Sequence, residues 1–88
     1  MFVKIYGRMT CPFCVRAKSL ADKLSAEVDG FSYEFIDIIE KDMSKDDIAK
    51  AIGVTQVQTV PQVVIDEKPI GGCTDFQAFV QEKFGITL

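Results

Sequence analysis

The sequence contains no histidine and only three cysteines among its 88 residues. A cysteine hydrolase of the Cys–His type needs a histidine as general base, so this absence excludes that class. A structural zinc site usually has four cysteine or histidine ligands, and three cysteines do not complete one. We therefore expect no bound metal, and the cysteines must serve a different chemistry.

The chain also lacks a long apolar stretch and a basic-then-apolar leader. No segment approaches the roughly 20 apolar residues that cross a bilayer, which predicts a protein without membrane contact. Without an export signal, the expected compartment is the reducing cytoplasm, where a cysteine pair is more often catalytic than structural. The length predicts a single domain over residues 1–88, and we expect a monomer.

Acidic residues outnumber basic ones, and the net charge of −3 argues against nucleic acid as a partner. Residues 1–25 nevertheless carry five cations against one acid, whereas residues 26–88 carry five lysines against twelve acids. The cationic part contains two of the cysteines and would stabilise a thiolate or attract an anionic substrate. Arg8, three residues before the first cysteine, is the strongest candidate for that role.

Two of the cysteines occur in the segment Thr10-Cys11-Pro12-Phe13-Cys14, between a predicted strand over 2–6 and a predicted helix. The helix is indicated by apolar residues at helical spacing, namely Ala17, Leu20, Ala21, Leu24 and Val28. Pro12 suits the first helical position, where its missing N–H costs nothing. Cys11 is then the N-cap and Cys14 the third helical residue.

This placement predicts an acidic thiol at Cys11. A thiolate there could accept hydrogen bonds from the N–H groups of Phe13 and Cys14, and the helix dipole favours negative charge. Cysteines in such positions have pKa values of roughly 3.5 to 7.5, compared with about 8.5 for a free thiol. Cys14 lies one turn further on, within reach of a disulfide. The pair predicts thiol–disulfide exchange; the alternative is an inert structural bridge, although so short a loop stabilises little.

The remaining sequence predicts the element order β-α-β-α-β-β-α. After the first helix, the expected elements are a strand over 31–38, a helix over 45–52 with Ile48, Ala51 and Ile52 on its apolar face, a strand over 62–65, a turn over 66–68, an edge strand at 69–70 and a helix over 75–84. Thr74 and Gln77 match a capping box, with Thr74 as N-cap. The order predicts two parallel strands joined by a helix, then a hairpin and a closing helix.

Three blocks of the sequence together resemble a small dithiol glutaredoxin of the bacterial and phage type. They are Gly7-Arg8 with the C-P-F-C segment, then 59–61, and then 71–75. The resemblance runs over nearly the whole chain and implies an α/β, thioredoxin-like fold with a four-stranded mixed sheet flanked by three helices. Phe13 departs from the commonest form, which has tyrosine there.

The resemblance implies that Cys11 is the nucleophile and Cys14 the resolving thiol of a redox-active disulfide. It also implies a glutathione site formed by Arg8, Phe13, Thr59, Val60, Pro61, Thr74 and Asp75. Pro61 would be a cis-proline facing the cysteines.

Each part of glutathione has an implied partner in this site. The backbone of Val60 would pair with the cysteinyl part in the manner of an added β-strand. Thr74 and Asp75 would hold the γ-glutamyl end, while Arg8 and Thr59 would lie near the glycyl carboxylate.

The implied function is a glutathione-dependent thiol–disulfide oxidoreductase that acts on protein disulfides and glutathionylated mixed disulfides. The resemblance suggests ribonucleotide reductase as one substrate. Two alternatives stay open: a thioredoxin-like protein reduced by thioredoxin reductase, and a non-catalytic iron–sulfur carrier ligated by Cys11 and glutathione, which the stiff Pro12 disfavours. Cys73 is interpreted as a small buried hydrophobe, with a secondary oxidation site as the alternative.

Overall fold

The computed structural model describes residues 1–86. Its elements are β1 (Phe2–Gly7), α1 (Pro12–Glu27), β2 (Ser32–Asp37), α2 (Lys45–Ile52), β3 (Gln62–Ile65), β4 (Lys68–Gly71) and α3 (Cys73–Phe84). The predicted order β-α-β-α-β-β-α is therefore confirmed. No helix in the described part of the chain is long and apolar enough to span a membrane.

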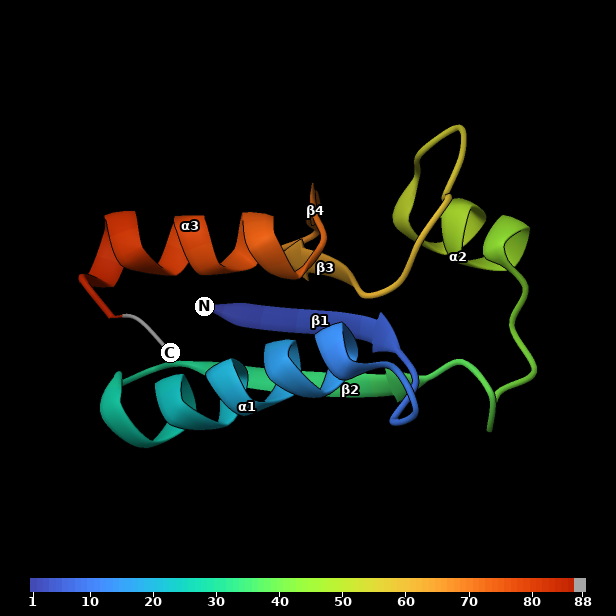
Figure 1. The fold of residues 1–88 in the computed structure, drawn as a ribbon. Helices are drawn as coiled ribbons and strands as arrows, with labels where there is room; N and C mark the ends of the chain where they lie inside the picture. Colours follow the sequence, from blue (N-terminus) through green and yellow to red (C-terminus); the bar gives the residue numbers. More distant parts are fainter. Residues whose placement is uncertain (87–88) are drawn as a thin grey trace.

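The four strands form one mixed sheet in the order β2-β1-β3-β4. β1 and β2 run parallel and are connected by α1, whereas β3 is antiparallel to β1 and forms a hairpin with β4. The N-terminus and the end of α3 lie at one end of the sheet, while α2 lies at the opposite end, near the turn between β1 and α1 (Figure 1). The predicted crossover and hairpin are both present.

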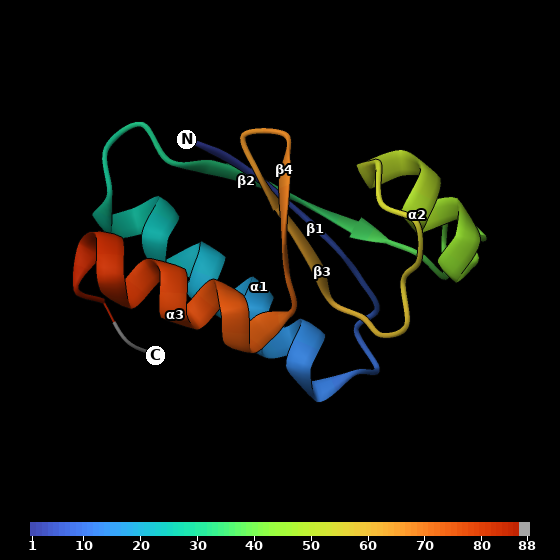
Figure 2. The same ribbon diagram turned by 90° about the horizontal axis from the view of Figure 1, so that it is seen from above.

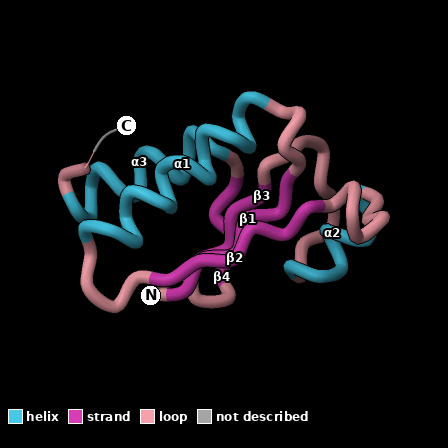
Figure 3. The backbone as a smooth tube through the Cα atoms, turned by 90° about the horizontal axis from the view of Figure 1, so that it is seen from below, coloured by secondary structure: helices cyan, strands magenta, loops and turns pink. Residues whose placement is uncertain are grey.

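α1 and α3 lie side by side on one face of the sheet (Figures 2 and 3). α2 lies beyond the ends of the strands and packs against residues of the opposite face (Figure 2). Alternate residues of β1 separate the two faces, as the period of a strand requires. Val3 and Ile5 are in the main core with α1 and α3, whereas Tyr6 packs with Ile48 of α2 in a smaller cluster. β1 is thus packed on both of its faces.

The ends of α2 follow local rules. The Ser44 side chain accepts the N–H of Asp47 at 3.1 Å, and the Asp47 carboxylate accepts the N–H of Ser44 at 2.9 Å, which completes a capping box. Gly53 ends the helix with a left-handed φ of 79°. The predicted apolar face is wrong in one position, because Ala49 is buried and Ala51 is exposed.

The start of α3 corrects the predicted capping box. Gly72, not Thr74, is the N-cap, and Cys73 is the first helical residue. Asp75 rather than Gln77 occupies the third helical position, where its carboxylate accepts the N–H of Gly72 at 3.0 Å. Cys73, which thereby lies inside the helix, is buried in the core. The helix therefore begins two residues earlier than predicted.

The hairpin turn is also shorter than predicted. Asp66 and Glu67 alone form it, both with positive φ (48° and 72°), so Lys68 already belongs to β4. Positive φ at both central residues is the backbone that matches the right-handed twist of paired strands.

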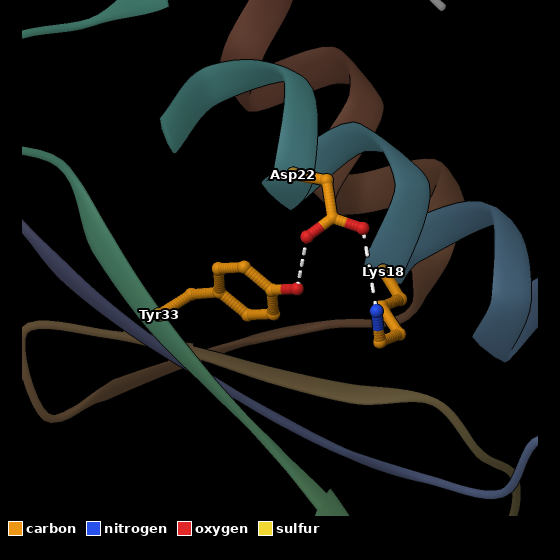
Figure 4. Close-up of polar contacts among 3 residues, drawn as sticks. All are labelled: Lys18, Asp22 and Tyr33. Atoms are coloured by element: carbon orange, nitrogen blue, oxygen red, sulfur yellow. Dashed lines mark hydrogen bonds and ion pairs between the residues drawn. The ribbon is translucent and has the colours of Figure 1, made fainter. Parts of the chain in front are cut away.

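A polar cluster fastens α1 to the edge strand β2. The hydroxyl of Tyr33 donates to the Asp22 carboxylate, whose other oxygen lies 3.3 Å from the Lys18 ammonium (Figure 4). Lys18 and Asp22 are one helical turn apart, so both can meet a single strand residue. The cluster fixes the helix that carries the cysteine pair relative to the sheet.

Candidate active site

Cys11 and Cys14 lie where β1 turns into α1, at the end of the molecule that also carries α2 (Figure 1). Cys11 is the N-cap of α1 with extended backbone, and Pro12 occupies the first helical turn, as predicted. The Cys11 side chain is partly accessible, while that of Cys14 is completely buried. All three cysteines are free thiols. One exposed and one covered sulfur suit an attacking and a resolving thiol.

The environment of Cys11 favours its thiolate. Burial alone would raise its pKa, but the N–H of Cys14, the Cys14 thiol, the N–H of Phe13 and the charge of Arg8 together lower the pKa below the ordinary value. The N–H groups of Phe13 and Cys14 are the partners predicted for the Cys11 thiolate, and the protonated thiol makes no cap hydrogen bond. The Cys11 thiol lies 3.8 Å from the carbonyl oxygen of Val60. A protonated sulfur can donate a weak hydrogen bond to such an oxygen.

Cys14 has the opposite tendency. Burial raises its pKa to about 11, and the hydrogen bond and negative charge of the neighbouring Cys11 sulfur act in the same direction. The proton therefore stays on Cys14 while Cys11 ionises, so the two thiols differ in both exposure and acidity. Gly7 makes room for this sulfur: a Cβ atom at Gly7 would lie 2.7 Å from Cys14 Sγ. This role of Gly7 was not predicted from the sequence.

The second predicted block lies directly opposite Cys11. The Val60–Pro61 peptide bond is cis, as the resemblance implied. Pro61 is buried, Val60 is partly buried, and the Val60 carbonyl faces the Cys11 sulfur. Two segments that are 49 residues apart in the sequence therefore meet at the Cys11 thiol.

The third block adjoins the second. A Cβ atom at Gly72 would lie 3.6 Å from the carbonyl oxygen of Pro61, so the N-terminus of α3 lies beside the cis-proline. Thr74 and Asp75 are exposed in the first turn of this helix, where free N–H groups favour an anion. The Asp75 carboxylate has a structural duty as well, because it accepts the N–H of Gly72.

Arg8, Cys11, Thr59 and Val60 line one groove of about 450 Å³. The structure therefore brings together the predicted residues on this side of the thiol. The same groove is completed by residues that sequence analysis missed, namely Ile38, Ile39, Met43, Ser44, Lys45 and Gln58. A larger cavity of about 560 Å³, lined by residues that include Phe2 and Tyr6, contains no cysteine and lies apart from this chemistry.

Phe13 and Cys73 flank the thiol pair in different ways. Phe13 is 55% exposed, and the guanidinium of Arg16 lies 5.7 Å from the centre of its ring. Its apolar face is thus available beside Cys11. Cys73 is buried as predicted, and burial raises the pKa of its thiol.

Within residues 1–86, no group of three or more histidine, cysteine or acidic side chains is arranged to hold a metal ion.

Comparison with known proteins agrees with this geometry. The family model described as Glutaredoxin matches residues 3–70. Glutaredoxin from Haemophilus influenzae is 57% identical over 86 residues, which cover 98% of each chain. The structure of reduced Escherichia coli glutaredoxin superimposes with a TM-score of 0.84 at 46% identity and covers 98% of this chain and 100% of that one.

A more distant neighbour is the buckwheat glutaredoxin–glutathione complex. It superimposes with a TM-score of 0.64 at 27% identity and covers 94% of this chain and 69% of that one. The family match extends over most of the chain, and the similar structures share its fold. The chain therefore belongs to the glutaredoxin family of thiol–disulfide oxidoreductases.

Proposed function

We propose that the protein reduces protein disulfides and glutathionylated mixed disulfides with glutathione as the reductant. The observation that carries this proposal is the contrast between Cys11, accessible with a lowered pKa, and Cys14, buried with a pKa of about 11. At neutral pH the Cys11 sulfur is therefore the better nucleophile, and the Cys14 sulfur stays protonated until it attacks the mixed disulfide.

In the dithiol route, the Cys11 thiolate attacks one sulfur of a substrate disulfide. The first substrate thiolate leaves, and a mixed disulfide joins Cys11 to the other half. Cys14 loses its proton and attacks the Cys11 sulfur, which releases the second substrate thiol and leaves a Cys11–Cys14 disulfide. The substrate has gained two electrons, and the enzyme has lost two.

Glutathione then restores the reduced enzyme. One glutathione thiolate attacks Cys11, which frees Cys14 as a thiol and leaves glutathione bound to Cys11. A second glutathione thiolate attacks the glutathione sulfur, so oxidised glutathione departs and the Cys11 thiolate returns. In the monothiol route, Cys11 takes glutathione directly from a glutathionylated protein, and only this last step follows.

The proposed glutathione site extends to both sides of Cys11. Arg8 and Thr59 in the groove suit the glycyl carboxylate, and the Val60 backbone suits the cysteinyl part. Thr74 and Asp75 at the start of α3 suit the γ-glutamyl end, because the helix N-terminus attracts its carboxylate and Asp75 its ammonium group. The exposed ring of Phe13 adds an apolar surface. A related protein from buckwheat forms a glutathione complex, which supports this class of ligand.

We further propose a cytoplasmic monomer, with ribonucleotide reductase among its substrates. These points rest on the family and on the bacterial relatives.

The deciding experiment couples the protein to glutathione, glutathione reductase and NADPH, with the mixed disulfide of glutathione and 2-mercaptoethanol as substrate. NADPH oxidation that depends on the protein supports the proposal. Turnover with thioredoxin reductase but not with glutathione would favour the thioredoxin-like alternative.

A further inference from the structure

The groove beside Cys11 is larger than the proposed glutathione contacts require. Arg8, Thr59 and Val60 account for one part of its wall. The rest comes from the connection between β2 and α2, which contributes Ile39, Met43 and the first residue of α2, Lys45. We call these three residues the β2–α2 wall. Glutathione has no apolar side chain that would match Ile39 or Met43.

Ile39 is held in an exposed position. It is 66% exposed, more than any other large apolar residue in the described part of the chain. The Asp37 carboxylate accepts the N–H groups of Ile39 and Glu40 at 2.9 and 3.2 Å, and the N–H of Met43 donates to the carbonyl oxygen of Ile38 at 2.8 Å. The turn therefore fixes the outward direction of this side chain.

Other exposed apolar side chains gather at the same end of the molecule. Met9, Phe13 and Val15, each within four residues of Cys11, are between 36% and 55% exposed. A single exposed apolar residue is ordinary. A cluster around a reactive thiol, next to a groove, is typical of an interaction surface.

The charge of the groove has one sign. Arg8 and Lys45 line it, and no aspartate or glutamate is among its described lining residues. Lys45 is the first residue of α2, where the helix dipole disfavours a cation. It also forms no ion pair among the described residues. Helix stability therefore does not account for this lysine, and its charge adds to that of Arg8 in the groove.

We propose that the β2–α2 wall and Arg8 bind the polypeptide that flanks the reactive cysteine of a protein substrate. The favoured segment is extended, with an apolar side chain against Ile39 and Met43 and a carboxylate between Arg8 and Lys45. This inference rests on the proposed function, which supplies the exchange reaction. The segment occupies the groove during attack by Cys11, and glutathione uses the Arg8 end after the substrate has left.

The test uses chromogenic disulfides and no glutathione. Two cysteine peptides, one with leucine and glutamate beside the cysteine and one with serine and lysine, are each linked to thionitrobenzoate. The reference is the mixed disulfide of thionitrobenzoate and 2-mercaptoethanol. In each reaction the Cys11 thiolate attacks the peptide or mercaptoethanol sulfur, and the released thionitrobenzoate is measured by its absorbance in stopped flow.

We expect the leucine–glutamate peptide to react about tenfold faster than the serine–lysine peptide, each relative to the reference disulfide. Ile39→Ser and Lys45→Glu should each reduce this ratio about three- to fivefold. Lys68→Glu, which reverses an exposed lysine outside the groove, should leave it within about twofold. Urea unfolding establishes that each variant is folded, and sedimentation measures its assembly state.

Equal rates for the two peptides would overturn the proposal, as would ratios that Lys68→Glu lowers as much as Lys45→Glu. A dimer that Ile39→Ser dissociates would assign the β2–α2 wall to a second copy of the chain and overturn it too. Failure of the proposed function has a different signature: without thiol exchange, Cys11 would release no thionitrobenzoate from any of the three disulfides, and without glutathione dependence only the coupled assay with glutathione reductase would fail.

Discussion

Gly7 and Cys14 are packed so closely that no space is left for a side chain at position 7. A Cβ atom at Gly7 would lie 2.7 Å from Cys14 Sγ and 3.0 Å from Cys14 Cβ. Gly7 is the last residue of β1, and Cys14 is buried in the first turn of α1. The strand therefore sets how deeply the resolving thiol sits below Cys11.

Gly7→Ala should destabilise the fold because the added methyl group must displace Cys14 or the strand. Overpacking of this kind costs about 1–3 kcal/mol, measurable by urea unfolding. The double variant Gly7→Ala/Cys14→Ala removes the closest clashing atom, so the two changes should cost less together than the sum of their separate effects. Additive free energies would show that the strain lies elsewhere.

The two cysteines should differ in the reactions that they support. Cys11→Ser should abolish both routes, since it removes the accessible nucleophile. Cys14→Ser should retain deglutathionylation within about threefold while reduction of protein disulfides falls at least about tenfold. The two activities are measured with a glutathionylated peptide and with a protein disulfide. Equal loss of deglutathionylation in both variants would contradict the assignment.

The pH dependence of alkylation should reveal one acidic thiol. The pKa of Cys11 is lowered, so its thiolate, and with it the rate of iodoacetamide modification, should appear at a lower pH than the value of about 8.5 for a free thiol. Cys14 has a pKa of about 11 and should stay protonated and slow up to pH 9. Peptide mass spectrometry identifies the modified residue.

Arg8→Ala should shift the Cys11 profile to higher pH, because it removes a positive charge that lowers the pKa. Lys68→Glu is the control for a charge change outside the groove, and its profile should match that of the wild type. A fast thiol that titrates only near the free value in the wild type would refute the role of the helix terminus.

The negative charge of the Asp75 carboxylate should contribute to glutathione binding, and the neutral side chain of Asp75→Asn should not replace it. Asp75→Asn keeps an oxygen that can accept the Gly72 N–H but loses the charge proposed to pair with the γ-glutamyl ammonium. We expect apparent KM for glutathione to rise roughly three- to thirtyfold. Reduction of the Cys11–Cys14 disulfide by dithiothreitol should not change.

Asp75→Ala separates the two duties of this carboxylate. It should show the same loss with glutathione and an additional loss of stability of about 0.5–2 kcal/mol, because the N–H of Gly72 loses its partner. If Asp75→Asn left turnover with glutathione unaffected, or slowed both reductants alike, the γ-glutamyl contact would be wrong.

The cluster that fastens α1 to β2 predicts a graded effect on stability. Tyr33→Phe removes the hydroxyl that donates to Asp22 and should cost about 0.5–1 kcal/mol (Figure 4). Lys18→Ala removes only the exposed ion pair with Asp22 and should cost less than about 0.5 kcal/mol. Urea unfolding measures both; a larger loss for Lys18→Ala would place the stabilisation in the ion pair.

The sequence by itself determined the features that depend on neighbours along the chain. Pro12 and the apolar spacing of α1 placed Cys11 at the N-cap, and the helix predicted over 45–52 has the bounds of α2. Arg8 was recognised because it lies three residues from Cys11. Hydrogen bonds and charges within one helical turn act the same way in any fold, so residue type and spacing suffice to predict them.

The start of α3 was decided by tertiary packing. Thr74 with Gln77 and Gly72 with Asp75 are two competing caps, offset by two residues. Threonine and glycine are nearly equivalent N-caps, and in the structure Cys73 is the first helical residue and is buried in the core. Burial of a side chain outweighs the small difference between two caps.

The β2–α2 wall could not be predicted for a related reason. Ile39 and Lys45 are about 30 residues from Cys11 in the sequence; Ile39 belongs to a charged and irregular stretch, and Lys45 is the first residue of α2. Only the parallel pairing of β1 with β2 brings the ends of both strands to one edge of the sheet, and with them the turn that exposes Ile39 beside the thiol. Such a contact depends on strand register over the whole sheet, which no local pattern of residues specifies.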